Sequence, residues 1–233
     1  MSDWDRESIA ALRSAVYRGD GSLVEVVRGR LTDDVLQLAG DGLLGAIAQR
    51  VPGAVDLAAQ CATALRVRCW DGDEELAKEL DVALGEGAVP LLRTVPVDLE
   101  MLSSFMEGDP LWGPARIDLK TGEVWTDQED GSEEQDEDDD DDRWLCVEHL
   151  GSSVGYGDME LFITTVTDPT KVDLLSVAII GRGAFRRFKD VLARWPDERE
   201  RFHLMSADRQ RGRGRQWLAG QGFRPSATAM TQH

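Results

Sequence analysis

The sequence of 233 residues predicts an α+β fold that is mostly helical and carries one small three-stranded antiparallel sheet in its C-terminal half. Three observations lead to this fold class. Apolar residues recur at helical spacing through residues 1–95 and again after residue 157. Two short alternating segments flank a Gly-containing turn near residue 121, as in a β-hairpin. A third alternating segment at residues 144–149 predicts one more strand, with helices packed against the sheet.

The first 95 residues are expected to form a helical N-terminal region. Short amphipathic helices are predicted between tight turns made of Gly and Asp. Such turns are expected at Gly19-Asp20-Gly21, at Gly40-Asp41-Gly42 and at Asp71-Gly72-Asp73. Residues 88–96 contain two prolines and are interpreted as a connector. We therefore divide the chain into a helical region, residues 1–95, and an α+β domain, residues 96–233.

The predicted α+β domain begins with a helix and then the sheet. Asp98 is expected to cap a short helix that ends at Gly108. Ile117 and Leu119 alternate with charged residues before the turn at Lys120-Thr121-Gly122, which predicts the hairpin. After the hairpin, twelve of the sixteen residues from 127 to 142 are acidic. A run this acidic cannot bury itself, so we expect a disordered loop inserted between two strands of the sheet.

Helices are predicted again from residue 157 onward. Asp168-Pro169 and the glycines at positions 181 and 183 are expected to separate the first three of them. The third helix should turn Phe185, Phe188 and Leu192 toward the core, because these residues share one helical face. Two separate helices are expected after it, one that reaches His203 and one over residues 207–219.

The chain separates its charge along the sequence. Its formal net charge is −18, yet residues 182–224 hold twelve Lys and Arg against five Asp and Glu. This basic segment therefore stands within an otherwise strongly acidic chain. A chain that segregates charge in this way is expected to bind a partner through its local field.

The C-terminal part also resembles a known family. The hairpin Ile117–Val124, the segment Asp158–Phe162 and, above all, Gly181–Leu192 are similar to uncharacterised protein family 0158, a set of bacterial proteins. The resemblance covers about Val97 to Phe223, and the whole layout is similar to an actinobacterial form with an extra helical N-terminal region. It implies a related fold and no particular activity, because the family has no established function.

From the residues we expect a non-catalytic binding or regulatory protein that acts through a solvent-facing basic surface of its C-terminal helices. The cations of the helix that begins at Gly183 lie off its apolar stripe, so they should face solvent. A protein partner is expected, and the residues do not identify the ligand. The candidate residues for binding an anion or a partner are Arg182, Arg186, Arg187, Lys189, Arg211 and Arg215.

The last helix carries arginines at alternate positions from 209 to 215. In a helix, Arg209 and Arg213 fall on one side, and Arg211 and Arg215 fall on nearly the opposite side. The four would form a single patch only if the segment were extended. The plain alternative is two solvated faces that make exposed ion pairs worth ~0–1 kcal/mol each.

Two other functions stay open. A nucleic-acid-binding protein would use the same six candidate cations, with the acidic loop masking them until it moves away. An enzyme acting on a small anionic substrate would have Asp158, Glu160 and Arg182 as its only cluster.

No cofactor and no metal are expected. The three histidines and three cysteines lack metal-ligand spacing. Gly181-Arg182-Gly183 follows a helix instead of a strand, so it is interpreted as a helix end and a corner instead of a phosphate loop. No apolar window has the length of a membrane helix, and the N-terminus lacks the pattern of a secretory signal. We therefore expect a cytoplasmic protein that does not bind membranes.

Overall fold

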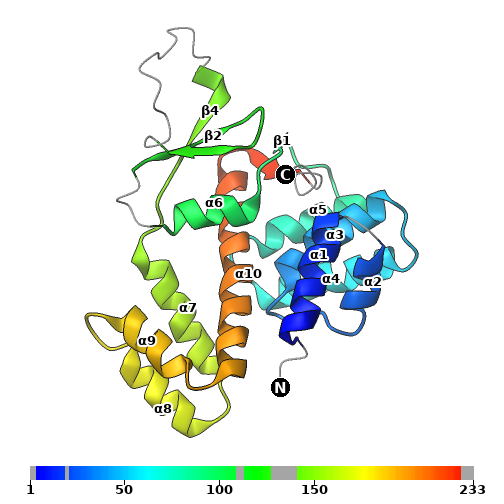
Figure 1. Ribbon diagram of the computed structural model, residues 1–233. Coiled ribbons are helices and arrows are strands. Elements are labelled where there is room, and N and C mark those ends of the chain that lie inside the picture. The colour runs from blue at the N-terminus through cyan, green and yellow to red at the C-terminus, as the bar shows by residue number, and fades with distance from the viewer. Residues whose placement is uncertain (1–3, 19–20, 109–112, 127–140, 227–233) are drawn as a thin grey trace.

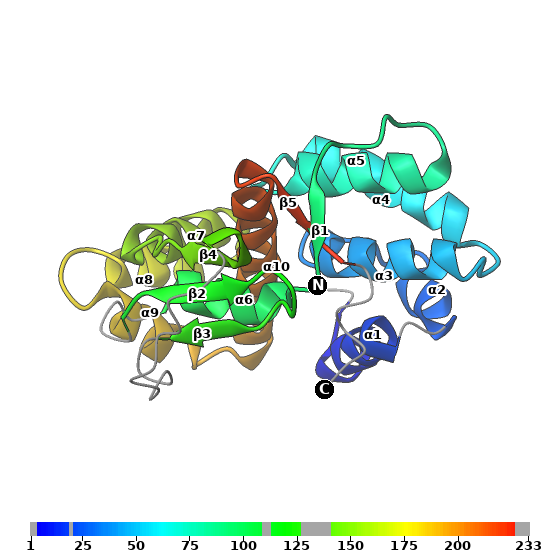
Figure 2. The ribbon, with the colours of Figure 1, turned by 90° about the horizontal axis from the view of Figure 1, so that it is seen from above.

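The structure is a computed structural model, and it describes residues 4–18, 21–108, 113–126 and 141–226. A long helix, α10 (Pro196–Gly220), runs through the middle of the molecule (Figure 1). The N-terminal helices lie on one side of α10, and the sheet and the other C-terminal helices lie on the opposite side, as the view from above shows (Figure 2). The described residues form ten α-helices, a three-stranded sheet and a two-stranded sheet, which confirms a mostly helical α+β fold.

Five helices form the N-terminal layer. Helices α3, α4 and α5 pack against one another, and α1 and α2 pack against α3. The bounds are α1 Arg6–Arg18, α2 Ser22–Val27, α3 Leu36–Ala48, α4 Ala54–Arg68 and α5 Asp73–Leu84. Their apolar faces share one core, which includes Leu12, Leu43 and Leu65. Leu204 of α10 belongs to the same core, so this layer is docked on the central helix.

The break expected at Gly40-Asp41-Gly42 is wrong, because α3 runs through it without interruption. The two glycines serve close packing instead of a turn. A Cβ on Gly40 would lie 2.6 Å from a methyl group of Leu76, and a Cβ on Gly42 would lie 2.6 Å from a methyl group of Leu23. Each glycine therefore admits a leucine from a neighbouring helix against the backbone of α3, and the helix accepts the loss of propensity.

The three-stranded sheet is antiparallel, with the order β3-β2-β4. Strand β2 spans Ala115–Asp118, β3 spans Val124–Thr126 and β4 spans Trp144–Val147, preceded by the short 3₁₀ turn η2, Asp141–Arg143. Ile117 lies opposite Val124 in one neighbouring strand and Leu145 in the other, so the predicted hairpin and third strand are confirmed. The acidic loop expected to be disordered lies almost wholly outside the described residues.

The helix before the sheet, α6 (Leu99–Met106), begins as predicted. The Asp98 side chain accepts hydrogen bonds from the backbone N–H groups of Glu100 and Met101, which is the N-cap arrangement. Helix α6 packs against α10. Leu102 and Met106 of α6 share a second core with Ile117 of the sheet.

The connector holds a strand that the sequence did not reveal. Strand β1 (Arg93–Val95) pairs in parallel with β5 (Phe223–Pro225), with Arg93 opposite Phe223. Each strand has only three residues, too few to show an alternating pattern. The pair ties the end of the N-terminal region to the segment that follows α10. The boundary at residue 95 stays a prediction.

Three helices form the remaining corner of the molecule. They are α7 Ser152–Thr165, α8 Pro169–Ala178 and α9 Ala184–Leu192. Phe162, Phe188 and Phe202 meet edge to face at centroid distances of 4.9–6.3 Å and anchor a third core. The inward placement expected for Phe185 is wrong. Its side chain is 39% exposed, because Ala184, Phe188 and Leu192 take the buried face of α9.

The two helices expected after α9 are one continuous helix of 25 residues, α10. Phe202, Leu204, Met205 and Leu218 of this helix enter all three cores. Its middle part contains glycines that again mark a close approach. A Cβ on Gly212 would lie 2.1 Å from the carbonyl oxygen of Asp71 in the turn before α5. The central helix therefore touches the N-terminal layer backbone to backbone.

Candidate functional site

The arginines in the middle of α10 are buried and paired. Arg211 is 3% exposed and Arg215 is 1% exposed. As the helical geometry predicts, Arg209 and Arg213 point to one side of α10, toward Asp158, and Arg211 and Arg215 point to the other side, toward Asp41. The alternative of a single flat patch on an extended segment is therefore wrong.

The row that faces the N-terminal layer joins α10 to α3, α5 and α6. Arg215 forms ion pairs with Glu79, at 3.1 Å, and with Asp41, and its Nε donates to Gln37 Oε1 at 3.0 Å. Arg211 pairs with the same Asp41 at 3.2 Å and with Glu100 at 3.1 Å. A buried guanidinium needs such partners, because an uncompensated buried charge is strongly destabilising.

The opposite row joins α10 to α7 and to the end of α6. Arg213 donates from Nη1 and Nη2 to the two carboxylate oxygens of Asp158, both at 3.0 Å. Its Nε donates to Glu107 Oε1 at 2.7 Å. Arg209 donates from Nε to Asp158 at 2.6 Å, and the Ser206 hydroxyl donates to the same carboxylate at 3.1 Å. Asp158 is thus the common acceptor of this side.

A further buried cluster lies where α10 meets the turn before α5. Arg68 pairs with Asp208 of α10 at 2.6 Å and with Asp73 at 2.5 Å. Asp73 also accepts the backbone N–H of Trp70 at 2.7 Å and the amide of Gln37 at 2.9 Å. The predicted turn at residues 71–73 is confirmed, although Asp73 serves as a buried ion-pair partner as well as the first residue of α5.

Burial and pairing act against each other at these groups. Burial raises the pKa of Glu79 above its ordinary value, and the nearby Arg215 opposes the rise. Burial likewise raises the pKa of Glu107, against the effect of Arg213. Burial acts to lower the pKa of Arg215, but Asp41 and Glu79 outweigh it, so the pKa is raised. The arginines therefore stay cationic and hold the acids in place.

The solvent-facing placement expected for Arg211 and Arg215 is wrong. Their partners come from segments more than a hundred residues away in the chain, so the sequence around them gives no sign of their burial. The exposed ion pairs offered as the plain alternative are replaced by buried ones. Both arginines connect α10 to neighbouring helices, so their guanidinium groups do not form the solvent-facing basic surface that was expected.

Arg187 binds backbone carbonyl groups at the end of α8. Its guanidinium donates to the carbonyl oxygens of Ala178 at 3.1 Å, of Ile180 at 2.5 Å and of Arg182. These carbonyls lie at or just beyond the end of α8, where helical backbone groups lack partners. Arg187 therefore caps α8 and fixes the corner at Gly181-Arg182-Gly183. Gly181 and Gly183 adopt φ angles of +75° and +77°, as a tight corner requires.

Arg187 is nevertheless exposed, and so are the other three candidate residues, as expected. Arg182 lies in the corner between α8 and α9, and Arg186 and Lys189 lie on α9. The Arg186 side chain is 91% exposed and approaches Asp190 at 4.0 Å. Lys189 has no ion-pair partner among the described residues. It differs from Arg186 because it borders a cavity.

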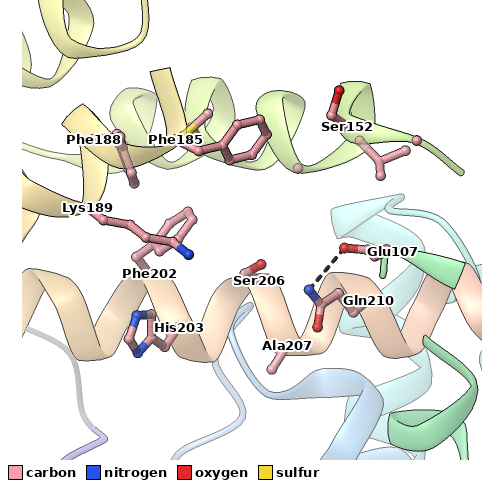
Figure 3. Close-up of a pocket in the computed structure, with 14 residues that line it drawn as sticks. Glu107, Ser152, Phe185, Phe188, Lys189, Phe202, His203, Ser206, Ala207 and Gln210 are labelled. Atoms are coloured by element: carbon pink, nitrogen blue, oxygen red, sulfur yellow. Dashed lines mark hydrogen bonds between the residues drawn. The ribbon is translucent and has the colours of Figure 1, made fainter. Parts of the chain in front are cut away.

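The cavity, which we call the α9 pocket, has a volume of about 440 Å³ and lies between α7, α9 and α10 (Figure 3). Rings and aliphatic groups supply much of its wall. Glu107, at the end of α6, borders one end. The residues used below are Glu107, Val154, Met159, Phe185, Phe188, Lys189, Phe202, His203, Ser206 and Gln210.

The basic and acidic side chains of the α9 pocket lie at opposite ends (Figure 3). Figure 3 shows Lys189 and His203 toward one end, with Gln210 and Glu107 at the other. Glu107 accepts the amide of Gln210 at 3.0 Å as well as the guanidinium of Arg213. The acid at one end is thus already compensated, whereas Lys189 and His203 have no hydrogen-bond partner in the described part of the chain.

Four residues that line the α9 pocket could have been found from the sequence. His203, Ser206, Ala207 and Gln210 stand at i, i+3, i+4 and i+7, so they share one face of a helix. A largely polar stripe on a helix that also carries Phe202 and Met205 indicates a face that does not enter the core. The break expected after His203 hid this pattern.

A second cavity of about 300 Å³ lies between α1, α3 and α6, and its lining includes Tyr17, Glu100 and Arg211. The cation of Arg211 is already paired with Asp41 and Glu100, so it offers no free charge there. This cavity is the weaker candidate.

The cluster considered for an enzyme is not brought together as a reactive centre. Asp158 is buried and engaged by two arginines, whereas Glu160 and Arg182 are exposed. Within the described ranges, no group of three or more His, Cys, Asp or Glu side chains could hold a metal ion.

The comparisons with known proteins agree with the resemblance noted above. The family model described as Uncharacterised protein family (UPF0158) matches residues 117–231. This C-terminal part of the chain therefore belongs to that family. The match begins at Ile117 instead of Val97, so it leaves α6 and the N-terminal layer outside. The bacterial and actinobacterial assignment stays a prediction.

No curated protein and no solved structure matches the chain. The family is uncharacterised, so membership carries no activity to this chain. Among the helices of the described residues, none combines the length and apolar character that crossing a membrane requires.

Proposed function

We propose that this chain is a non-catalytic binding protein whose ligand site is the α9 pocket. The observation that carries the proposal is a cavity of about 440 Å³ that combines three phenyl rings with a lysine lacking an acidic partner among the described residues. Small-molecule sites are typically about 300–1,000 Å³, mostly apolar, and fixed by a few polar groups. The α9 pocket has this size and this composition.

The walls of the pocket are held in place before any ligand arrives. Helix α10 is fixed on both faces by the buried ion pairs of Arg211, Arg213 and Arg215. Helix α9 is fixed by Phe188, whose ring meets that of Phe202 edge to face at a centroid distance of 4.9 Å. A preformed site avoids the cost of ordering side chains on binding, which favours a binding role for this corner.

The polar groups of the pocket favour binding over catalysis. The Ser206 hydroxyl donates to Asp158, and no hydrogen bond joins it to His203 in the described structure. Glu107 is occupied by Arg213 and Gln210. Nucleophilic catalysis needs a nucleophile in contact with its own base. These side chains are arranged to orient a ligand, and Asp158 and Glu107 are committed to the arginines.

The nucleic-acid alternative loses part of its support. Of its six cations, Arg211 and Arg215 are buried and Arg187 caps α8. Affinity for nucleic acid depends on how many cations neutralise phosphates. Four of the six are exposed, but Arg187 is engaged with the carbonyls at the end of α8, so three uncommitted cations on a chain of net charge −18 are a weak basis. A protein partner and a cytoplasmic location remain our predictions from the sequence.

The proposal is tested with a neutral fluorescent probe of apolar cavities, N-phenyl-1-naphthylamine. We expect saturable single-site binding to the wild-type chain. Val154→Trp should abolish it, because Val154 lines the pocket and a tryptophan would fill the space. Ser153→Trp is the matched control, since Ser153 is the exposed neighbour on α7 and does not line the pocket. Equal binding by both variants, or no binding by the wild type, would refute the proposed site.

A further inference from the structure

We propose that the α9 pocket takes a small amphipathic anion, a molecule with an aromatic or branched apolar body and one carboxylate or phosphate group. This inference rests on the proposed function and adds the ligand chemistry. It follows from three features of the lining: the balance of charge, the place of the cation, and the rings beside it.

The lining of the pocket carries one lysine and one acid, but within the described part of the chain only the acid is already paired. Glu107 is the acidic residue that lines the pocket, and it accepts from Arg213 at 2.7 Å and from Gln210 at 3.0 Å. Its charge is therefore met inside the protein. Lys189 has no acidic partner among the described residues, so its charge is available to a ligand. A ligand that carries one negative charge could pair with Lys189.

The cation lies at the edge of an apolar surface. Lys189 reaches across from α9 toward α10, where Phe202 and His203 lie (Figure 3). His203 has no hydrogen-bond partner in the described structure and can donate from a ring nitrogen to the same anionic group. A charge-assisted hydrogen bond beside apolar walls is stronger than one in open water. An anionic group is expected to lie at this end.

The rings beside the cation define the rest of the ligand. Phe185 is 39% exposed and borders the cavity, and the buried Phe188 and Phe202 line it as well. Met159 and Val154 complete the apolar wall. An exposed phenyl ring that lines a cavity is covered when an apolar body enters, which removes its area from water. The size of the cavity limits that body to a small molecule.

The charge preference is tested with a matched pair of probes, naphthalene-1-acetate and the neutral naphthalene-1-acetamide, by calorimetric titration. The pair shares one apolar body and differs in charge. We expect the acetate to bind about tenfold more tightly than the amide, the difference that one charge-assisted hydrogen bond supplies. 1-Naphthyl phosphate forms a third arm and decides whether a carboxylate or a phosphate is preferred. Tighter binding of either anion than of the amide supports the inference.

Variants assign the preference to its source. Lys189→Gln should bring acetate and amide to within about threefold of each other and leave the affinity for the amide unchanged, because the glutamine keeps a polar side chain without the charge. Arg186→Gln is the matched control, since Arg186 is an exposed cation on the same helix that does not line the pocket, and it should keep the tenfold preference.

The outcomes separate the two proposals. If neither the acetate nor the phosphate binds more tightly than the amide to the wild type, the pocket binds ligands and the inference about charge is wrong. If the preference survives in Lys189→Gln, Lys189 is not its source and the inference is again wrong. If no naphthalene probe binds and N-phenyl-1-naphthylamine also fails, the proposed function itself is refuted.

Discussion

Replacing Gly212 of α10 by alanine tests whether the central helix touches the N-terminal layer backbone to backbone. The new Cβ would lie 2.1 Å from the carbonyl oxygen of Asp71, where an ordinary contact begins at 3.4 Å. The turn at Asp71-Gly72 would have to move by more than an ångström. It cannot move freely, because Asp73 holds it through Arg68 and through the backbone N–H of Trp70.

The magnitude follows from opposing terms. Alanine favours the helix over glycine by about 1 kcal/mol. Overpacking a rigid contact costs about 1–3 kcal/mol, and each buried hydrogen bond broken by a shift of the turn costs about 1–3 kcal/mol more. We therefore expect Gly212→Ala to lower the free energy of unfolding by about 2–4 kcal/mol. For a chain of this size the melting temperature should fall by roughly 5–15 °C.

The assay is urea unfolding followed by tryptophan fluorescence, with Gly220→Ala as the matched control. Gly220 ends the same helix, and a Cβ there would meet nothing within 4 Å, so alanine should be neutral or slightly stabilising. The midpoint should fall in Gly212→Ala with the denaturant slope unchanged. If the two variants unfold at the same midpoint, the close approach of α10 to the turn does not exist in solution.

Two further predictions concern the buried charges. Arg215→Ala should lower the free energy of unfolding by about 3–5 kcal/mol in thermal or urea unfolding, because it leaves Glu79 buried without its cation. The control, Arg186→Ala, removes an exposed arginine and should change the free energy of unfolding by less than about 0.5 kcal/mol. Comparable losses in the two variants would mean that Arg215 is solvated. Burial raises the pKa of Asp34 from 3.8 to about 6, so ionising this carboxyl destabilises the folded chain. The destabilisation is absent below pH ~4 and reaches at most ~3 kcal/mol above pH ~6. Asp34→Asn should therefore stabilise the chain at pH 7 and leave it unchanged near pH 4, and an equal effect at both pH values would contradict the raised pKa.

Local signals in the sequence predicted the parts of the fold that depend on neighbouring residues. The hairpin followed from alternation around Lys120-Thr121-Gly122, and the start of α6 followed from the capping residue Asp98. The helix boundary at Asp168-Pro169 followed from the proline, and Asp168 caps α8 as well. In each case the residues that decide the structure lie within a few positions of one another.

Glycines inside helices are ambiguous in the sequence for one physical reason. A glycine can break a helix, or it can let another segment approach the backbone, and the sequence nearby is the same in both cases. Gly40 and Gly42 predict a break, but Leu76 and Leu23 fill the space beside them. The partner that decides the matter is distant in the chain.

The buried arginines escape prediction for a related reason. Arginine is almost never fully buried unless it is paired, so exposure is the natural expectation. The partners that overturn it, such as Asp41 for Arg215 and Asp158 for Arg213, are separated from them by many residues and become neighbours only in the folded chain. The even spacing of the arginines predicts two opposite faces correctly, but it does not indicate what covers them.

Because these arginines pair with acids of the N-terminal layer, we expect the middle of α10 to need that layer in order to be helical. Alone, the segment around Gly212 and Gly214 is a poor helix, since each glycine costs about 1 kcal/mol relative to alanine. Like charges at i and i+4, as in Arg211 and Arg215, cost a few tenths of a kcal/mol more. In the folded chain, Asp41 pairs with both arginines and Glu79 pairs with Arg215, and these attractions offset the repulsion.

A fragment of residues 96–233 should therefore lose structure at a defined place. It lacks Asp41, Glu79 and the turn that packs on Gly212, so we expect amide hydrogens of residues 209–216 to exchange much faster than in the full chain. Residues 159–163 of α7 should keep their protection, because the Phe162 cluster with Phe188 lies wholly within the fragment. If the middle of α10 keeps full protection, the boundary at residue 95 separates two independent domains, and the ion pairs across it contribute little to the helix.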